Sequence, residues 1–156
     1  MLLHDSLLAR SEGDRWALPS LDLETERTGP SQSSVTILVV DDVEESRWIT
    51  ARMLRDEGYA VIEAESAEQA MRLLAERGEI QVIVADIVMP GGMDGLELAR
   101  WSLATAPWRK VVLMSGFPRG FSQQVESGPK IPLLLKPFTP DQLASQIREV
   151  LHEKMN

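Results

Sequence analysis

Aspartates follow two apolar runs of the chain, and their carboxylates are the first groups that could do chemistry. Asp41 and Asp42 come directly after residues 35–40, and Asp86 comes directly after residues 82–85. Open α/β sheets place their sites at the carboxyl ends of strands, although an aspartate is also a common turn residue. Three carboxylates in one site repel one another unless a cation lies between them. Because Mg2+ prefers a few carboxylates plus waters, these aspartates predict a magnesium site.

A hydroxyl and an ammonium group end two further apolar runs. Ser115 ends residues 110–115, and Lys136 follows residues 131–135. A lysine and a hydroxyl beside a metal suit an anion with several oxygens, such as a phosphoryl group. The chain has no cysteine and only two histidines, one near each terminus, so the covalent acceptor of that group would be a carboxylate.

Five strand-like runs alternate with helix-like patterns along the chain. The runs are residues 35–40, 59–64, 82–85, 110–115 and 131–135. Helical patterns lie at residues 44–57, after Ser66, around Leu96 to Leu103 and after Thr139, and any helix in the Gly- and Pro-rich residues 116–130 must be short, such as 119–126.

This alternation predicts an α/β fold with a doubly wound, five-stranded parallel sheet and helices on both faces. The strand order 2-1-3-4-5, which is flavodoxin-like, is one of two common arrangements. The carboxyl ends of parallel strands share one edge of the sheet. The aspartates, the serine and the lysine that end the runs should therefore converge on one pocket.

Three helix starts carry residue types that cap helices. Ser66 and Thr139 are each followed three positions later by a glutamine, Gln69 and Gln142, which is the spacing of a capping box. Asp94 precedes a helical pattern, and we expect it to cap that helix rather than to bind a metal.

Composition excludes several classes of function. The net charge of −8 argues against a nucleic-acid binder, which should have a basic face. No apolar run approaches the roughly 20 residues that a membrane helix needs. The first ten residues lack the basic start and continuous apolar core of a signal peptide. We therefore expect a cytoplasmic protein that binds neither nucleic acid nor a membrane.

Residues 1–34 differ from the rest of the chain. They carry six acidic and three basic residues and end in a linker-like stretch, residues 28–34. They are either a flexible, disordered extension or a segment that docks on its own domain or on a partner. The regular pattern, and with it the predicted domain, covers residues 35–154.

The regular part resembles the receiver domain of two-component response regulators. The resemblance covers about 120 residues and rests on four ordered motifs: Val39-Val40-Asp41-Asp42, Asp86-Ile-Val-Met-Pro90 with Asp94-Gly95, Val112-Leu-Met-Ser115-Gly116, and Leu134-Leu-Lys136-Pro137-Phe138.

The resemblance implies a magnesium site at the first and third strand ends. Asp42 would be a direct ligand, and Asp41 would help through a water molecule. Asp86 and the backbone carbonyl of Val88 would complete the protein ligands.

The resemblance also implies how a phosphoryl group would be held. Asp86 would be the phosphoacceptor, Ser115 would sense the phosphoryl oxygens, and Lys136 would form an ion pair with the group. The Lys136–Pro137 peptide bond would be cis, as it typically is in such domains.

Several positions depart from the commonest pattern of the family. Gly91 and Gly92 lengthen the loop after Asp86 by one glycine, and Leu133 stands where an aromatic switch residue is often found. Phe117 could take over that coupling, while the glycines and prolines of residues 116–130 interrupt the usual fourth helix. Three features, the extra glycine, Ser115-Gly-Phe117 and Lys136-Pro-Phe-Thr-Pro140, together resemble receivers of hybrid histidine kinases more than those of transcription factors.

Residues 44–57 have an apolar side, formed by Ile49, Met53 and Leu54, which we expect to be buried. Trp48 lies off this side, so it could be exposed and could dock a kinase or a dimer partner.

The predicted function is that of a receiver without a second output domain. A histidine kinase or a histidine phosphotransfer protein would supply the phosphoryl group, and phosphorylation would change binding to a downstream protein or to a second copy of the chain. The protein would not be an enzyme beyond its own phosphorylation and slow dephosphorylation.

Two other classes of function are compatible with parts of the pattern. Leu133 and residues 116–130 would suit a phosphorylation-independent interaction module, a pseudo-receiver. A metal-dependent phosphatase with an aspartyl intermediate is a weaker candidate, because the first strand ends in Asp-Asp-Val-Glu rather than in the Asp-x-Asp of haloacid-dehalogenase-like enzymes.

Overall fold

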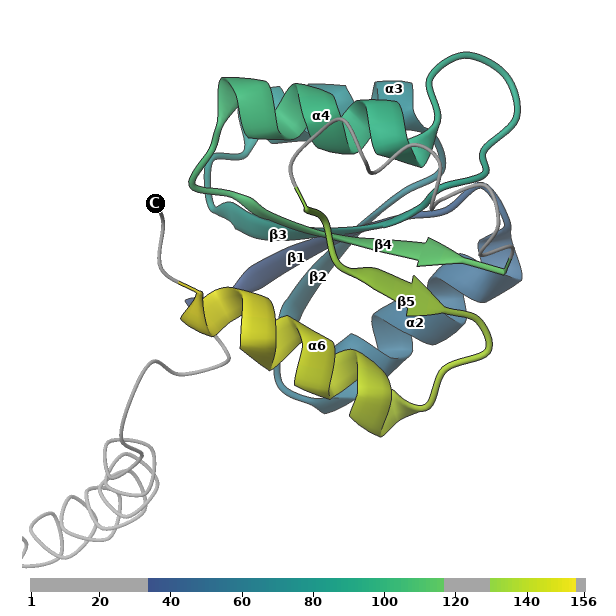
Figure 1. Cartoon of the computed structure of the whole chain (residues 1–156), viewed down its shortest axis with the longest axis vertical. Coiled ribbons are helices and arrows are strands. Elements are labelled where there is room, and N and C mark those ends of the chain that lie inside the picture. The colour runs from purple at the N-terminus through teal and green to yellow at the C-terminus, as the bar shows by residue number, and fades with distance from the viewer. Residues whose placement is uncertain (1–33, 117–129, 154–156) are drawn as a thin grey trace, which may run out of the picture. The chain divides into compact units, whose positions relative to one another are not determined.

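A five-stranded parallel sheet runs through the part of the chain that this computed structural model describes, residues 34–116 and 130–153. The strands are β1 (Thr36–Val40), β2 (Ala60–Ala64), β3 (Ile80–Asp86), β4 (Lys110–Ser115) and β5 (Leu133–Leu135). Their order in the sheet is β2-β1-β3-β4-β5, as shown in Figure 1, and all neighbouring strands are parallel. The predicted doubly wound order is confirmed.

Helices cover both faces of the sheet, as predicted. One face is covered by α2 (Glu44–Asp56) and α6 (Pro140–His152), and the other by α3 (Ala67–Glu76) and α4 (Gly95–Thr105) (Figure 1). In the described residues, no helix is long and apolar enough to cross a bilayer. The short helix predicted at 119–126 lies outside the described residues.

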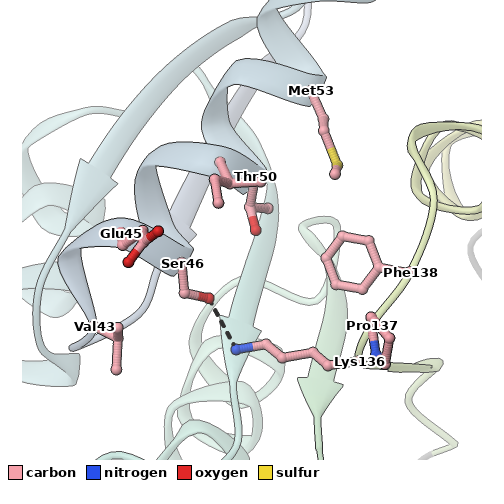
Figure 2. Close-up of a pocket in the computed structure, with 9 residues that line it drawn as sticks. Val43, Glu45, Ser46, Thr50, Met53, Lys136, Pro137 and Phe138 are labelled. Carbon is pink, nitrogen blue, oxygen red and sulfur yellow. Dashed lines mark hydrogen bonds between the residues drawn. The ribbon is translucent and has the colours of Figure 1, made fainter.

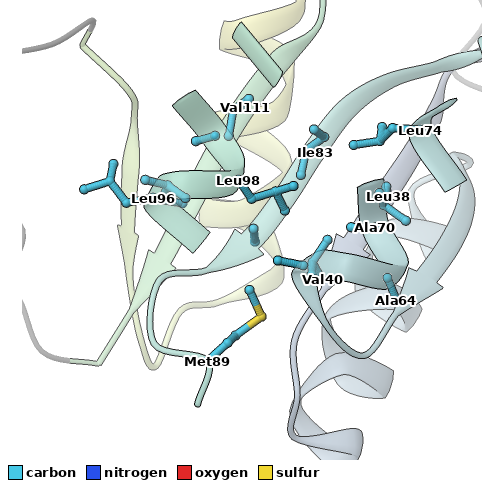
Figure 3. Close-up of a cluster of buried hydrophobic side chains, with 14 of the residues drawn as sticks. Leu38, Val40, Ala64, Ala70, Leu74, Ile83, Met89, Leu96, Leu98 and Val111 are labelled. Atoms are coloured by element: carbon cyan, nitrogen blue, oxygen red, sulfur yellow. The ribbon is translucent and has the colours of Figure 1, made fainter. Parts of the chain in front are cut away.

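The continuous apolar runs are explained by burial on both faces of the sheet. Side chains of a strand alternate between faces, so Leu38 and Val40 join the cluster under α3 and α4. Ile37 and Val39 join the cluster under α2 and α6. Figure 3 shows Leu38, Val40 and Ile83 packed in the first of these clusters. A strand buried on both sides has no polar alternation, which is why these runs read as uniformly apolar.

The predicted caps form, with one difference. Thr139 and Gln142 make a complete capping box at α6, and Asp94 makes one with Glu97 at α4. The Ser66 hydroxyl accepts the backbone N–H of Gln69 at 3.0 Å, as expected. The side chain of Gln69, however, accepts the N–H of Glu65 rather than that of Ser66.

Three element predictions need correction. Strand β3 begins at Ile80, two residues before the predicted run of 82–85. The buried side of α2 consists of Thr50, Ala51 and Leu54, whereas Ile49 is 41% exposed. Strand β5 begins at Leu133 rather than at Ile131, because the intervening Pro132 has no N–H to donate to the ladder. The carbonyl of Pro132 still accepts the N–H of Leu113 at 2.9 Å.

Candidate functional site

The strand register brings the polar strand ends to one edge of the sheet. Val40 lies opposite Ala85, so Asp41 follows at the level of Asp86. Ser115 lies opposite Leu135, so Lys136 follows one residue later. The backbone N–H of Lys136 also donates to the carbonyl of Ser115 at 2.9 Å.

The ammonium group of Lys136 joins the two carboxylates at the centre of the site. Its Nζ lies 2.8 Å from Oδ2 of Asp86 and 3.3 Å from Oδ2 of Asp41. Partial burial disfavours the charged lysine, but the hydrogen bond and charge of Asp86, aided by Asp41, outweigh this effect and raise the pKa of Lys136. The ammonium group therefore stays charged near neutral pH and holds the ends of β1 and β3 together.

The second oxygen of each carboxylate binds a backbone N–H two residues further along the chain. Oδ1 of Asp41 accepts the N–H of Val43 at 3.0 Å, and Oδ1 of Asp86 accepts the N–H of Val88 at 3.0 Å. Each aspartate is thus held in a local turn of the same kind. Asp41 is fully buried and Asp86 is 9% exposed, so Asp86 is the one of these two carboxylates that reaches solvent.

The other predicted site residues lie around this centre. Ser115 is buried at the end of β4, whereas Asp42 is exposed beside Asp41. Val88 is exposed two residues after Asp86. In the described part of the chain, no three acidic or histidine side chains are close enough together to hold a metal ion. The predicted set of magnesium ligands therefore stays a prediction.

The donor types nevertheless suit a hard cation. Asp41, Asp42 and Asp86 contribute carboxylate oxygens only, and Lys136 neutralises one of their three charges. The strand ends thus carry a surplus of negative charge. Mg2+ binds oxygen ligands of this kind and keeps several waters.

A second layer of charged residues supports the loop after β1. Arg47 donates from Nη1 to the backbone carbonyl of Asp41 at 2.7 Å, and its Nε lies 3.3 Å from Oε1 of Glu63. Arg55 contacts the other oxygen of Glu63. Sequence reasoning missed these residues. The available signal was the position of Arg47 in the first turns of the helix that follows the two aspartates.

The loop after β3 is held by a residue of α3. Glu68 accepts the backbone N–H of Met93 at 3.2 Å, and this hydrogen bond is the main reason why the pKa of Glu68 is lowered. A Cβ on Gly92 would collide with Oε2 of Glu68, so the extra glycine of this loop leaves room for the contact. Gly91 has a φ of +90°, a conformation that favours glycine.

An apolar groove opens beside Lys136, between α2 and the start of α6. It has a volume of about 530 Å3 and is lined mainly by Val43, Ile49, Met53, Pro137 and Phe138, with Ser46 and Lys136 at one end. Figure 2 shows the Ser46 hydroxyl directed at the Lys136 ammonium group, with Phe138 on the far wall. The exposure of Ile49 follows from its place in this wall.

The remaining sequence predictions have mixed outcomes. The Lys136–Pro137 peptide bond is cis, as the resemblance implied. Leu133 is partly buried and packs against the cluster under α3 and α4. Trp48 is 52% exposed and lies under the guanidinium of Arg52. Phe117 and most of residues 116–130 lie outside the described residues.

Comparison with known proteins assigns the chain to one family. The family model for the response regulator receiver domain matches residues 37–148. The chain is 31% identical over 150 residues to the sensor kinase CckA of Brucella abortus (strain 2308), an alignment that covers 95% of this chain. It spans only 16% of that kinase's length.

Solved structures give the same result. The receiver domain of the hybrid histidine kinase CckA is 31% identical and superposes with a TM-score of 0.62, covering 75% of this chain and 99% of that one. The response regulator TrrA of Thermotoga maritima, solved in complex with Mg2+ and BeF, is 28% identical with a TM-score of 0.67. That match covers 74% of this chain and 98% of TrrA.

Proposed function

Because the chain belongs to the response regulator receiver family, whose members are signalling modules, we propose that it accepts a phosphoryl group on Asp86. The observation that carries the proposal is the pairing of Asp86 with Lys136 at 2.8 Å. Of the two carboxylates that bind Lys136, Asp86 is the one that reaches solvent, and the ammonium group beside it is positioned to neutralise an anion.

The reaction would be a displacement at phosphorus. An oxygen of Asp86 attacks the phosphoryl group of a phosphohistidine on the donor protein. The new O–P bond forms as the P–N bond breaks, and the bonding electrons go to the imidazole nitrogen. Lys136 offsets the negative charge of the transferred oxygens, and the hydroxyl of Ser115 donates a hydrogen bond to one of them.

We further propose that Mg2+ binds at the same edge of the sheet. Asp41, Asp42, Asp86 and the backbone carbonyl of Val88 would hold it. When bound, the ion would supply charge neutralisation for the acidic cluster and for the phosphoryl oxygens. Asp42 is exposed and adjacent, so its carboxylate is available to complete the set.

The partner in this reaction would be a histidine kinase or a histidine phosphotransfer protein. The similarity to the receiver of the hybrid kinase CckA supports this choice. Phosphorylation would then shift a conformational equilibrium and change binding to a downstream protein or to a second copy of the chain.

Intact mass after incubation with acetyl phosphate tests the proposal. Wild type with Mg2+ should gain one phosphoryl group, and Asp86→Asn should gain none. Removal of Mg2+ with EDTA should abolish the adduct on wild type. If wild type gains nothing from acetyl phosphate or from a cognate kinase, the phosphorylation-independent interaction module replaces the proposal.

A further inference from the structure

Ser46 is a third partner of the Lys136 ammonium group. It lies in the first turn of α2, and its Oγ is 3.1 Å from Nζ of Lys136 (Figure 2). A lysine ammonium group has three N–H donors. Asp86, Asp41 and Ser46 supply one acceptor each, so the three donors are matched by acceptors from β3, β1 and α2.

We propose that Ser46 is a positioning residue for Lys136 in phosphoryl binding. The inference rests on the proposed function, because it concerns the lysine that would hold the phosphoryl group. Ser46 would not contact the phosphoryl group itself. It acts through the ammonium group alone.

The three acceptors differ in what the reaction does to them. Asp86 becomes an acyl phosphate, so its oxygen no longer carries the charge that attracts Lys136. Asp41 is a predicted metal ligand, so a bound Mg2+ would compete with Lys136 for its carboxylate charge. The hydroxyl of Ser46 is neutral and takes no part in bond making, so it can hold the ammonium group in place when both carboxylates change partners.

The location of Ser46 also separates its role from folding. It is only partly buried, at the rim of the groove between α2 and α6. Alanine has a higher helix propensity than serine, so Ser46→Ala should not lower the stability of α2. An effect of this substitution on phosphoryl binding would therefore have to arise at Lys136.

Beryllofluoride binding in the presence of Mg2+ is the readout, because beryllofluoride stands in for a phosphoryl group on the acceptor aspartate. Titration calorimetry on the full chain would compare wild type, Ser46→Ala, Ser46→Thr and Ser145→Ala. Ser145 is an exposed serine in α6, so it gives the same chemical change away from Lys136. Urea unfolding of each variant would be measured in parallel.

The inference predicts that Ser46→Ala binds beryllofluoride roughly 3- to 10-fold more weakly, as expected for one hydrogen bond to a charged group with partial access to water. Its unfolding midpoint should change little, because the gain in helix propensity offsets part of the lost hydrogen bond. Ser46→Thr keeps the hydroxyl and should bind within about 2-fold of wild type. Ser145→Ala should match wild type.

Two results would overturn the inference while leaving the proposed function intact. One is equal beryllofluoride affinity for wild type and Ser46→Ala. The other is a loss in Ser46→Ala that Ser46→Thr fails to restore, since the hydroxyl would then not be the cause. If wild type itself does not bind beryllofluoride, the proposed function fails and the inference fails with it.

Discussion

Gly95, the first residue of α4, packs directly against the backbone of the proposed phosphoacceptor. A Cβ at this position would overlap the carbonyl oxygen of Asp86 and would lie 2.8 Å from its carbonyl carbon and 2.9 Å from Cα of Ile87. These are backbone atoms, so no side chain can rotate away. The N–H of Gly95 also donates to the carbonyl of Ile87 at 2.9 Å, which keeps the two segments in contact.

Gly95→Ala should therefore destabilise the domain. Overpacking of this kind costs about 1–3 kcal/mol, and the smaller entropy of the unfolded alanine chain offsets about 0.4–1 kcal/mol of it. The expected net loss is roughly 1–2 kcal/mol in the free energy of unfolding. In urea this loss should lower the unfolding midpoint by about 0.5–1 M at an unchanged m-value.

Gly78→Ala is the matched control. A Cβ on Gly78 meets no atom within 4 Å, and its φ is not positive. This variant should be as stable as wild type or slightly more stable. If Gly95→Ala unfolds at the same urea concentration as Gly78→Ala, the close packing against Asp86 does not exist in solution and the reasoning is wrong.

Three further predictions concern other contacts. The buried hydroxyl of Ser102 has no hydrogen-bond partner among the described residues, so Ser102→Ala should raise the free energy of unfolding by about 1 kcal/mol, whereas a decrease would reveal a partner. The hydrogen bond from the Met93 N–H lowers the pKa of Glu68 below its ordinary value of 4.5. The stabilisation that this contact gives is therefore complete above the pKa of Glu68 in the unfolded chain, and it is lost as the pH falls through the lower pKa of the folded protein. The NMR shift of the Met93 amide should titrate below pH 4.5 in wild type and not in Glu68→Gln; a midpoint above 4.5 would contradict the contact. A double-mutant cycle with Arg47→Met and Glu63→Gln should give a coupling energy of about 0.5 kcal/mol in urea unfolding, and additive losses would mean that the ion pair does not support the Asp41 loop.

The sheet and its polar edge could be predicted because they depend on local patterns. A strand buried on both faces reads as an unbroken apolar run, and parallel strands bring their carboxyl ends to one edge. Asp41, Asp86 and Lys136 could therefore be placed together from residue order alone. The helix caps at Thr139 and Asp94 were predictable for the same reason, since each depends on residues three positions apart.

The contacts between distant elements could not be predicted in this way. Ser46 reaches Lys136 across 90 residues of chain, and Glu68 reaches Met93 across 25. Neither pairing leaves a period or a motif in the sequence. The prediction that Ile49 is buried is wrong. Its spacing with Met53 is helical, but the segment that contains Pro137 and Phe138 leaves that side of α2 open as a groove.

Chemical trapping of the phosphorylated residue tests the central claim most directly. Borohydride reduces an acyl phosphate to an alcohol, so a phosphorylated Asp86 would become homoserine at that position. Tandem mass spectrometry of wild type treated with acetyl phosphate and Mg2+ should find homoserine at residue 86 and should find none when EDTA is present. Homoserine at another aspartate, or unmodified Asp86 in a sample that carries the phosphoryl mass, would contradict the account.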